Sequence, residues 1–203
     1  YDTSTYADCF VVLGFSKYAA MRENEEALDL ALKLYDSIIR RFLRREFRTD
    51  PEPLPEGYKA HGIPMILLNT SQELLRAAEK LEHPAADEMA TWCHRLAKDL
   101  METFIGNDGT IRELVHDTLD EDTCILGRYV NPGHSLEDMW FLMHYATELG
   151  GERQQEIIDL ACRVIEKAFK LGWDDEYGGI FHFVDANGGK PQGELGAFAH
   201  HPL

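Results

Sequence analysis

The sequence predicts an all-α protein made of paired helices, an (α/α)6 toroid-type barrel of which about three helix pairs are present. Apolar residues recur at helical spacing along most of the chain, with charged residues on the opposite face of each segment. Three apolar segments also align with one another without gaps, and each is followed by a more amphipathic helix. Such a repeat indicates stacked helix pairs, which form either an open solenoid or a closed toroid.

The first helix of each pair favours the toroid over the solenoid. The segments CFVVLGF, IPMILL and MWFLMHYA are nearly all apolar, as an inner ring packed on both sides requires, whereas the second helices are amphipathic. Polar residues cluster at the N-terminal ends of the first helices, where the central pocket of a toroid opens. Three pairs are half of a six-pair barrel, so we expect residues 1–203 to form a single, partial barrel domain.

The individual helices follow from periodicity and from capping residues. They are expected near 4–22, 24–46, 63–81, 84–105, 134–149 and 152–171. Asn24 is placed to cap the second helix, Pro84 suits the first turn of the fourth, and the pair Gly150–Gly151 ends the fifth. Short β-hairpin loops are expected at GTIRELVHD and at GGIFHFVD, the second of which is followed by an Asn-Gly turn signal.

The composition excludes several classes of protein. A net charge of −16 opposes binding to nucleic acid, because a phosphate backbone requires clustered Lys and Arg. No apolar run approaches the roughly 18 residues that span a bilayer, so no membrane partner is expected. The four cysteines are scattered and form neither a CxxC pair nor a zinc-ligand spacing. A reducing, cytoplasmic location is therefore expected.

The segment LGRYVNPGHSLEDMWFLMH carries the candidate chemistry. Pro132 and Gly133 should open a helix, which places His134 in its first turn, near unpaired backbone N–H groups and the positive end of the helix dipole. That field favours a neutral imidazole, which accepts a proton near pH 7. Glu137, at i+3, lies on the same face and could orient the ring or bind a substrate hydroxyl. His134 and Glu137 thus predict a general acid/base site facing a pocket.

His134 and Glu137 allow two other interpretations. The pair could form no more than a capped helix start, with Glu137 satisfying the first N–H groups. A metal site is not expected, because no further His or carboxylate stands at helical spacing beside the pair. No Walker loop or dinucleotide fingerprint is present, so no cofactor is expected either.

The same residues carry a resemblance to a known family. CILGRYVNPGHSLEDMWFLMH resembles the GR-x-x-NPGH-x-x-E segment of the N-acylglucosamine 2-epimerase family, and LGWDDEYGGIFHFVDANGG resembles its GWD-x-x-x-GG-x-F-x-F-x-D segment. YADCFVVLGFSKYA and IPMILLNTSQELL resemble its earlier inner helices. The resemblance extends from about Tyr1 to Gly189, and the NPGH segment is its most specific part.

The resemblance implies an (α/α)6 barrel of roughly twice this length, with a sugar pocket at one end. It also implies inversion at C2 of a ring-opened aldose, by deprotonation and reprotonation between two histidines. His134 matches the first of these histidines, and Glu137 matches its hydrogen-bonding partner. The second histidine of the family lies in a Trp-rich helix start that this chain does not contain, and the tail residues His200 and His201 do not resemble it. The N- and C-terminal helix pairs of the family are also missing.

The resemblance assigns further residues to the pocket. Tyr6, Asn69 and Arg128 match positions that line or support it. Glu73 falls where relatives carry a glutamine or a histidine, a departure that bears on substrate choice. His61, just before GIPMILL, is expected to pack or to line the rim. The implied partner is a small-molecule sugar, and a homodimer is implied by the resemblance only.

The leading hypothesis is therefore a sugar 2-epimerase half-barrel that is catalytically incomplete as a fragment. Its alternatives are an aldose–ketose isomerase acting on mannose-type sugars and a non-catalytic helical-repeat binding fragment. A glycoside hydrolase of the same fold would need two carboxylates flanking the bond, for which Asp8, Glu73 and Glu137 are the apical candidates. A half-toroid should also expose the flanks of its inner helices as apolar patches, so the chain is expected to associate.

Overall fold

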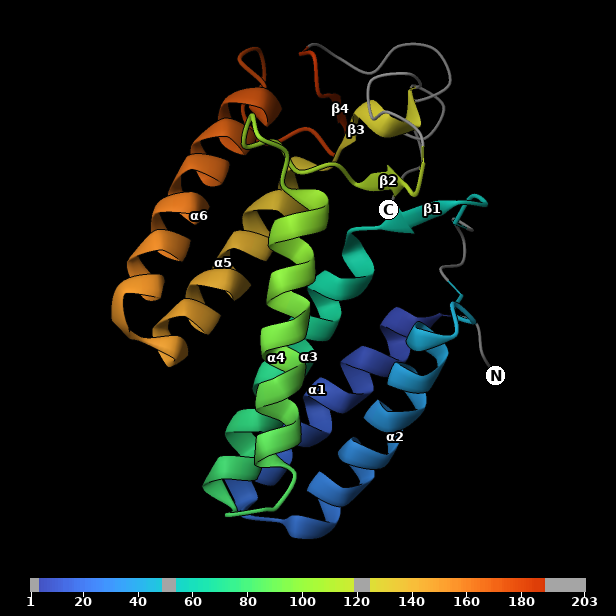
Figure 1. Ribbon diagram of the computed structural model, residues 1–203, viewed down its shortest axis with the longest axis vertical. Helices are drawn as coiled ribbons and strands as arrows, with labels where there is room; N and C mark the ends of the chain where they lie inside the picture. Colours follow the sequence, from blue (N-terminus) through green and yellow to red (C-terminus); the bar gives the residue numbers. More distant parts are fainter. Residues whose placement is uncertain (1–3, 49–53, 119–124, 189–203) are drawn as a thin grey trace. The chain divides into compact units, whose positions relative to one another are not determined.

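The computed structural model describes residues 4–48, 54–118 and 125–188, which fall into two compact units (Figure 1). Unit 1 comprises Tyr1–Pro55 and Ile63–Ala97, and unit 2 comprises Glu56–Gly62 and Lys98–Leu203. The predicted helices are all present. Their bounds are α1 Thr5–Arg22, α2 Glu25–Leu43, α3 Gly62–Lys80, α4 Ala86–Asp99, α5 Pro132–Leu149 and α6 Gly151–Gly172. Within the described ranges, no helix is both long and apolar enough to cross a membrane.

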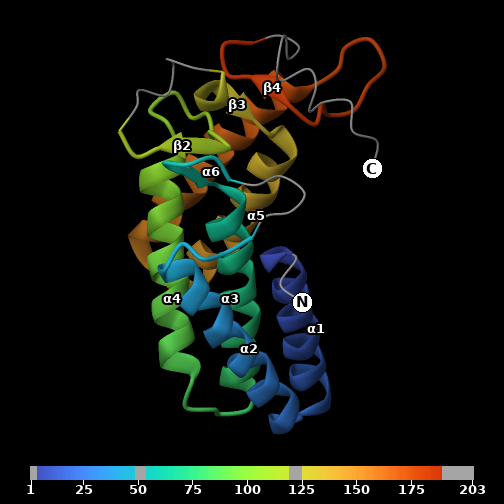
Figure 2. The same cartoon turned by 90° about the vertical axis from the view of Figure 1, so that its right-hand side faces the viewer.

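Unit 1 contains the antiparallel pair α1 and α2 together with α3 and most of α4 (Figures 1 and 2). The turn between α1 and α2 is tight, because Glu23 adopts a left-handed conformation with a φ of 50°. The side chain of Asn24 accepts a hydrogen bond from the backbone N–H of Ala27 at 2.8 Å, which confirms the predicted cap. Buried Tyr35 on α2 shares a hydrogen bond of 2.5 Å with Ser71 on α3, so the second pair is tied to the first.

Helix α1 buries a narrow stripe of mostly small residues and leaves large apolar side chains outside. The buried positions are Thr5, Cys9, Val12, Ser16 and Ala19. The exposed ones are Phe10, Val11, Phe15, Tyr18 and Met21. Helix α2 has the opposite character, since its apolar residues face inward and its charged residues face solvent, as predicted for a second helix.

Unit 2 is built on the antiparallel pair α5 and α6, which lie side by side in both views (Figures 1 and 2). Gly150 and Gly151 separate the two helices, and both have a φ of 68°, which explains why glycine occupies both positions. The end of α6 packs closely on the start of α5. A Cβ atom on Gly172 would lie 2.5 Å from Cβ of Pro132, so this contact leaves no room for a side chain.

Four short strands connect distant parts of unit 2. Strand β1, Tyr58–Ala60, pairs with β2, Leu114–His116, and β3, Tyr129–Val130, pairs with β4, Val184–Asp185, both in antiparallel register. The two β-like segments of the sequence therefore do form strands. Local hairpin loops are closed only by the single bridges Ile105–Ile111 and Trp173–Ile180, and the ladders join segments far apart in the chain.

Both ends of the fourth helix differ from the prediction, and α2 ends at Leu43 rather than near position 46. Helix α4 begins at Ala86 rather than at Pro84, and it passes at Leu100–Phe104 into a π-helical turn before the loop begins. The apolar periodicity of LMETF continues that of the α-helix, so periodicity does not reveal this change of hydrogen bonding.

Candidate active site

Strand pairing places His61 and Glu113 opposite each other. The register of β1 and β2 runs from Tyr58–His116 to Ala60–Leu114, and the next pair in this register is His61–Glu113. The backbone N–H of His61 donates to the carbonyl of Glu113 at 2.9 Å. Opposed residues of antiparallel strands project to the same face, so the two side chains are brought together where β1 passes into α3.

The next ladder bond brings in the start of α5. The backbone N–H of Glu113 donates to the carbonyl of Tyr129 at 2.9 Å, which joins β2 to the segment leading into the helix. Asn131 is the N-cap of α5, and its Oδ1 accepts from the backbone N–H of His134 at 3.1 Å. Pro132 occupies the first helical position, as predicted, and His134 lies in the first turn.

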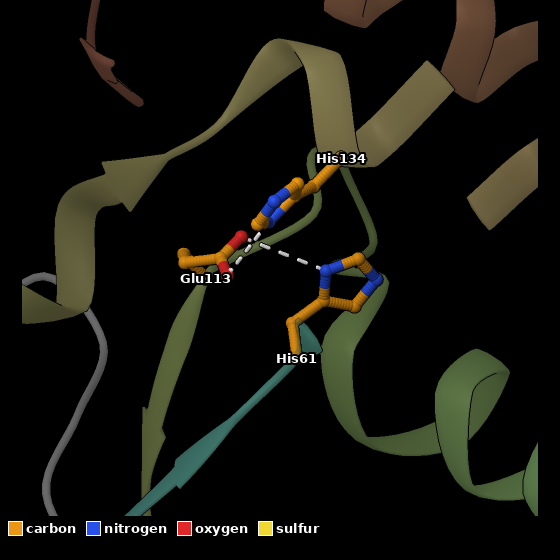
Figure 3. Close-up of side chains that lie close together, drawn as sticks. All are labelled: His61, Glu113 and His134. Atoms are coloured by element: carbon orange, nitrogen blue, oxygen red, sulfur yellow. Dashed lines mark hydrogen bonds and ion pairs between the residues drawn. The ribbon is translucent and has the colours of Figure 1, made fainter. Parts of the chain in front are cut away.

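The side chains of His134, Glu113 and His61 form one cluster (Figure 3). Nδ1–H of His134 donates to Oε1 of Glu113 at 3.0 Å, and Nδ1 of His61 lies 3.6 Å from Oε2 of the same carboxylate. On its other side, Nε2–H of His61 donates to Oδ2 of Asp138 at 3.0 Å. The ring of Phe104 packs edge-on against His61, with 5.5 Å between ring centroids.

The cluster has a closed end and an open end. The side chains of His61 and Asp138 are completely buried, and that of Glu113 is 12% exposed. The side chain of His134 is 38% exposed, so it is the member that a dissolved molecule can reach. Three atoms of the closed end are buried without a hydrogen-bond partner among the described residues, namely Nδ1 of His61, Oε2 of Glu113 and Oδ1 of Asp138.

The residue that orients His134 in the structure is Glu113, whereas the sequence had suggested Glu137. Glu137 lies on the same helix and is exposed, and the Nδ1 of His134 bonds with the carboxylate of Glu113, beside β2. The capping alternative for Glu137 is not needed, since Asn131 caps the helix. A role for Glu137 toward a substrate stays a prediction.

The charges in the cluster oppose the pKa shift expected from the helix start. Burial lowers the pKa of His134, but the adjacent Glu113 carboxylate outweighs it, and the net pKa lies above its ordinary value. Burial likewise opposes protonation of His61, yet the hydrogen bond with Asp138 and the negative charge of the nearby Glu113 raise its pKa to about 9. Although burial raises the pKa of Glu113, the two histidines hold it well below its usual range. The expected lowering of the His134 pKa is therefore wrong, because a contacting carboxylate outweighs the helix dipole.

The predicted residue Arg128 lies beside this cluster in unit 2. Its Nε–H donates to Oδ2 of Asp185 at 3.2 Å, and its carbonyl accepts from the backbone N–H of Ala186 at 2.8 Å. Arg128 thus ties the NPGH segment to the second motif of the sequence, where Phe183 packs on Tyr129 with 4.4 Å between ring centroids. That Arg128 lines or supports a sugar pocket stays a prediction.

The other predicted residues, Tyr6, Asn69 and Glu73, belong to unit 1. Tyr6 and Asn69 are half-buried on α1 and α3. Glu73 is buried and accepts from Nη1 of Arg76 at 2.6 Å, and it also pairs with Nζ of Lys17, so its charge is compensated within the unit. That these residues share one pocket with His134 stays a prediction. The tail histidines at positions 200 and 201 lie outside the described residues.

Comparison with known proteins matches this chain to one family over nearly its whole length. The family described as N-acylglucosamine 2-epimerase (GlcNAc 2-epimerase) matches residues 2–197. The N-acylglucosamine 2-epimerase of Bos taurus is 29% identical over 194 residues, covering 90% of this chain and 42% of the relative. That of Mus musculus is 31% identical over 189 residues, covering 90% of this chain and 43% of the relative. The chain therefore spans less than half the length of these curated relatives.

Solved structures show the same fold at low sequence identity. A D-mannose isomerase superposes with a TM-score of 0.68 at 18% identity, covering 93% of this chain and 48% of that protein. A sugar epimerase from a ruminal bacterium superposes with a TM-score of 0.67 at 12% identity, covering 94% of this chain and 48% of that protein. Both are (α/α)6 barrel proteins, which confirms the predicted fold class.

Proposed function

Because this chain belongs to the N-acylglucosamine 2-epimerase family, we propose that it forms part of a sugar 2-epimerase that interconverts N-acylglucosamine and N-acylmannosamine, or the related free hexoses. The observation that carries the proposal is the hydrogen bond between Nδ1 of His134 and Glu113, at the open end of an otherwise buried cluster. Deprotonation at C2 requires a base whose ring is held in place through one nitrogen while the other nitrogen can reach the substrate.

The hydrogen bond fixes which nitrogen of His134 reacts. With the proton on Nδ1 donated to Glu113, the lone pair of the neutral ring is on Nε2. In the ring-opened sugar, C2 adjoins the C1 carbonyl, so Nε2 takes the C2 proton while the electron pair of the C–H bond moves into an enolate. Return of a proton to the opposite face of C2 restores the carbonyl and inverts the centre, with no net oxidation.

Glu113 has two roles in this scheme. It sets the orientation of the ring, because its own position is fixed by backbone bonds to His61 and Tyr129. It also stabilises the imidazolium that forms when His134 takes the proton, since a carboxylate at 3.0 Å interacts favourably with that charge. Inversion requires a further proton donor on the other face of C2, so the proposal concerns the whole protein, to which this chain contributes the first base.

A second candidate is an aldose–ketose isomerase acting on mannose-type sugars. It is favoured because His134 is the most exposed member of the cluster, and a single base can take the proton from C2 and return it to C1 without a donor on the opposite face. The two reactions share the same first step and differ only in where the proton returns.

The proposal includes a reducing, cytoplasmic setting. It is supported by the cysteines of the described residues, since Cys9, Cys93 and Cys162 form no disulfide there. The expected ligand is a small-molecule sugar.

The test uses the full-length protein that contains this chain. We expect that incubation with N-acetylmannosamine or mannose in D2O yields the C2 epimer carrying deuterium at C2, followed by NMR, and that His134→Ala abolishes the exchange. His144→Ala is the matched control, because that histidine lies on the same helix, outside the cluster, and its Nε2 accepts from Nε1–H of Trp140 at 2.8 Å. Formation of a ketose would favour the isomerase, and absence of C2 exchange with both sugars would overturn the role of His134.

A further inference from the structure

We propose that His61, Glu113 and His134 form a binding site for one divalent transition-metal ion of the zinc class, and that the bound ion blocks the base. Two imidazoles and one carboxylate are a common ligand set for zinc. The residues come from three separate segments, the end of β1, the start of β2 and the first turn of α5 (Figure 3). Sequence spacing alone therefore gave no sign of the site.

The separations of the ligand atoms suit a tetrahedral ion. Bonds of roughly 2.0–2.2 Å place neighbouring ligand atoms about 3.3 Å apart. Oε1 of Glu113 lies 3.0 Å from Nδ1 of His134, and Oε2 lies 3.6 Å from Nδ1 of His61. All the ligand atoms lie within 4.8 Å of one another, so the two rings need to approach by at most about 1.5 Å.

Two of the ligand atoms have no other partner. Nδ1 of His61 and Oε2 of Glu113 are buried and make no hydrogen bond within the part of the chain that the structure describes. Both face the space between the three side chains, where they lie 3.6 Å apart. Buried polar atoms without partners are uncommon, and an ion in this space would satisfy both of them.

Asp138 supplies the outer contact that metal-binding histidines usually have. Its Oδ2 accepts from Nε2–H of His61 at 3.0 Å, and its side chain is completely buried. This bond keeps one proton of His61 on Nε2. Once Nδ1 releases its proton to solvent, the Nδ1 lone pair faces the cluster, as in a carboxylate–histidine–zinc arrangement. A divalent ion would also balance the two carboxylates, Glu113 and Asp138, in place of protons on the two rings.

The position of His134 determines the consequence for the reaction, and this part rests on the proposed function. An ion reaches the site past His134, which is the exposed member, and binds its Nδ1. Nδ1 gives up its proton to solvent and Nε2 takes one proton from solvent, so the ring stays neutral but Nε2 has no lone pair with which to take a proton from C2. We therefore infer that the ion inhibits the enzyme.

The binding test needs no sugar. The full-length protein is stripped with EDTA and titrated with Co²⁺, whose visible absorption is intense in tetrahedral sites, and then with Zn²⁺ as competitor. We expect one Co²⁺ per chain, loss of the absorption in His61→Gln and in Glu113→Gln, and affinity weakened roughly 10–100-fold in Asp138→Asn. His144→Gln, which removes a histidine outside the cluster, should bind like the wild type.

The titration of the wild-type protein can by itself contradict the proposed metal site. The test therefore remains decisive even if a variant fails to fold. Absence of tetrahedral Co²⁺ absorption in the wild type, or equal binding by a folded His61→Gln variant, overturns the site. In the second arm, Zn²⁺ should suppress deuterium exchange at C2, and EDTA should restore it. Exchange without metal binding would overturn this inference and leave the proposed function intact, whereas binding without inhibition would overturn the blocking of Nε2.

Discussion

A single carboxylate determines the orientation of the His134 ring. Glu113 accepts from its Nδ1 at 3.0 Å, and the backbone of Glu113 is bonded on both sides, to His61 and to Tyr129. The ring is therefore oriented by strand pairing rather than by a residue of its own helix. A helix-borne partner one turn away would move with α5, whereas Glu113 is fixed independently of it.

The first prediction separates the two candidate carboxylates. In the full-length protein, Glu113→Gln should reduce kcat for C2 exchange on the order of 10²-fold or more, because the amide cannot stabilise the imidazolium. Glu137→Gln should reduce it far less, since Glu137 is exposed and does not hold the ring. Steady-state kinetics on both variants show which carboxylate orients His134, and circular dichroism checks that both variants fold. A large loss in Glu137→Gln with little change in Glu113→Gln would show that the sequence-based assignment is the correct one.

A second prediction concerns the cysteines. Burial raises the pKa of the Cys9 thiol to about 12, so almost no thiolate is present near pH 8. Cys93 is also buried, whereas Cys162 is exposed on α6. Brief treatment with iodoacetamide at pH 8 should therefore modify Cys162 and spare the other two until urea is added, as read by peptide mass spectrometry. Equal modification of Cys9 and Cys162 without denaturant would contradict the burial of Cys9 on α1.

The local part of the site could be predicted from sequence, and the long-range part could not. His134 and its place in the first turn follow from the adjacent Pro132 and Gly133, which act over a few residues. Glu113 and His61 meet it only because residues 58–60 pair with residues 114–116, across two intervening helices. Three-residue strands carry almost no periodic signal, so nothing in the sequence joined these positions.

At the scale of elements, caps and glycines mark the helix ends reliably. Asn24 and the pair Gly150–Gly151 lie where the sequence placed them, because each satisfies a specific backbone requirement. Pro84 falls outside α4, since a proline tolerated in a first turn is equally tolerated just before it. The contact between α6 and α5 was not predictable, because it depends on how the helices cross and not on either helix alone.

That contact leads to a third prediction. Gly172→Ala should destabilise the protein by roughly 1–3 kcal/mol, because the new Cβ would lie 2.5 Å from Cβ and 2.6 Å from Cγ of Pro132, at the start of the helix that carries His134. Gly14→Ala is the matched control in α1, where a Cβ meets no atom within 4 Å, and it should stabilise by about 0.5–1 kcal/mol. Urea denaturation of both variants measures the difference. A shift of the two midpoints in the same direction would contradict the close packing at Gly172.

At the scale of the whole molecule, the helix pairs agree with the repeat seen in the sequence. Repeating apolar segments specify pairs because each pair buries its stripe against the next one. The helix pair at the edge of such an array has no neighbour on one side, so one of its faces stays uncovered. Helix α1 has such a face, since its large apolar residues are exposed while its small ones are buried.

This face gives the last prediction. At 3.6 residues per turn, the exposed positions Phe10, Val11, Phe15, Tyr18 and Met21 fall on one side of α1 and form a continuous apolar surface. Monomeric proteins rarely expose such a surface, so the 203-residue chain alone should self-associate despite a net charge of −16. Light scattering coupled to size-exclusion chromatography should show a mass that rises with concentration.

Substitutions distinguish this surface from scattered apolar residues. Combining Phe10→Ser with Met21→Ser should shift the chain toward monomer, because these side chains are 63% and 79% exposed and removing them costs no core packing. Tyr177→Ser, at a residue of unit 2 that is 81% exposed, should leave the association unchanged. A wild-type chain that stays monomeric at all concentrations would show that the apolar face of α1 is tolerated in water. An effect of Tyr177→Ser equal to that of the double variant would instead place the contact elsewhere.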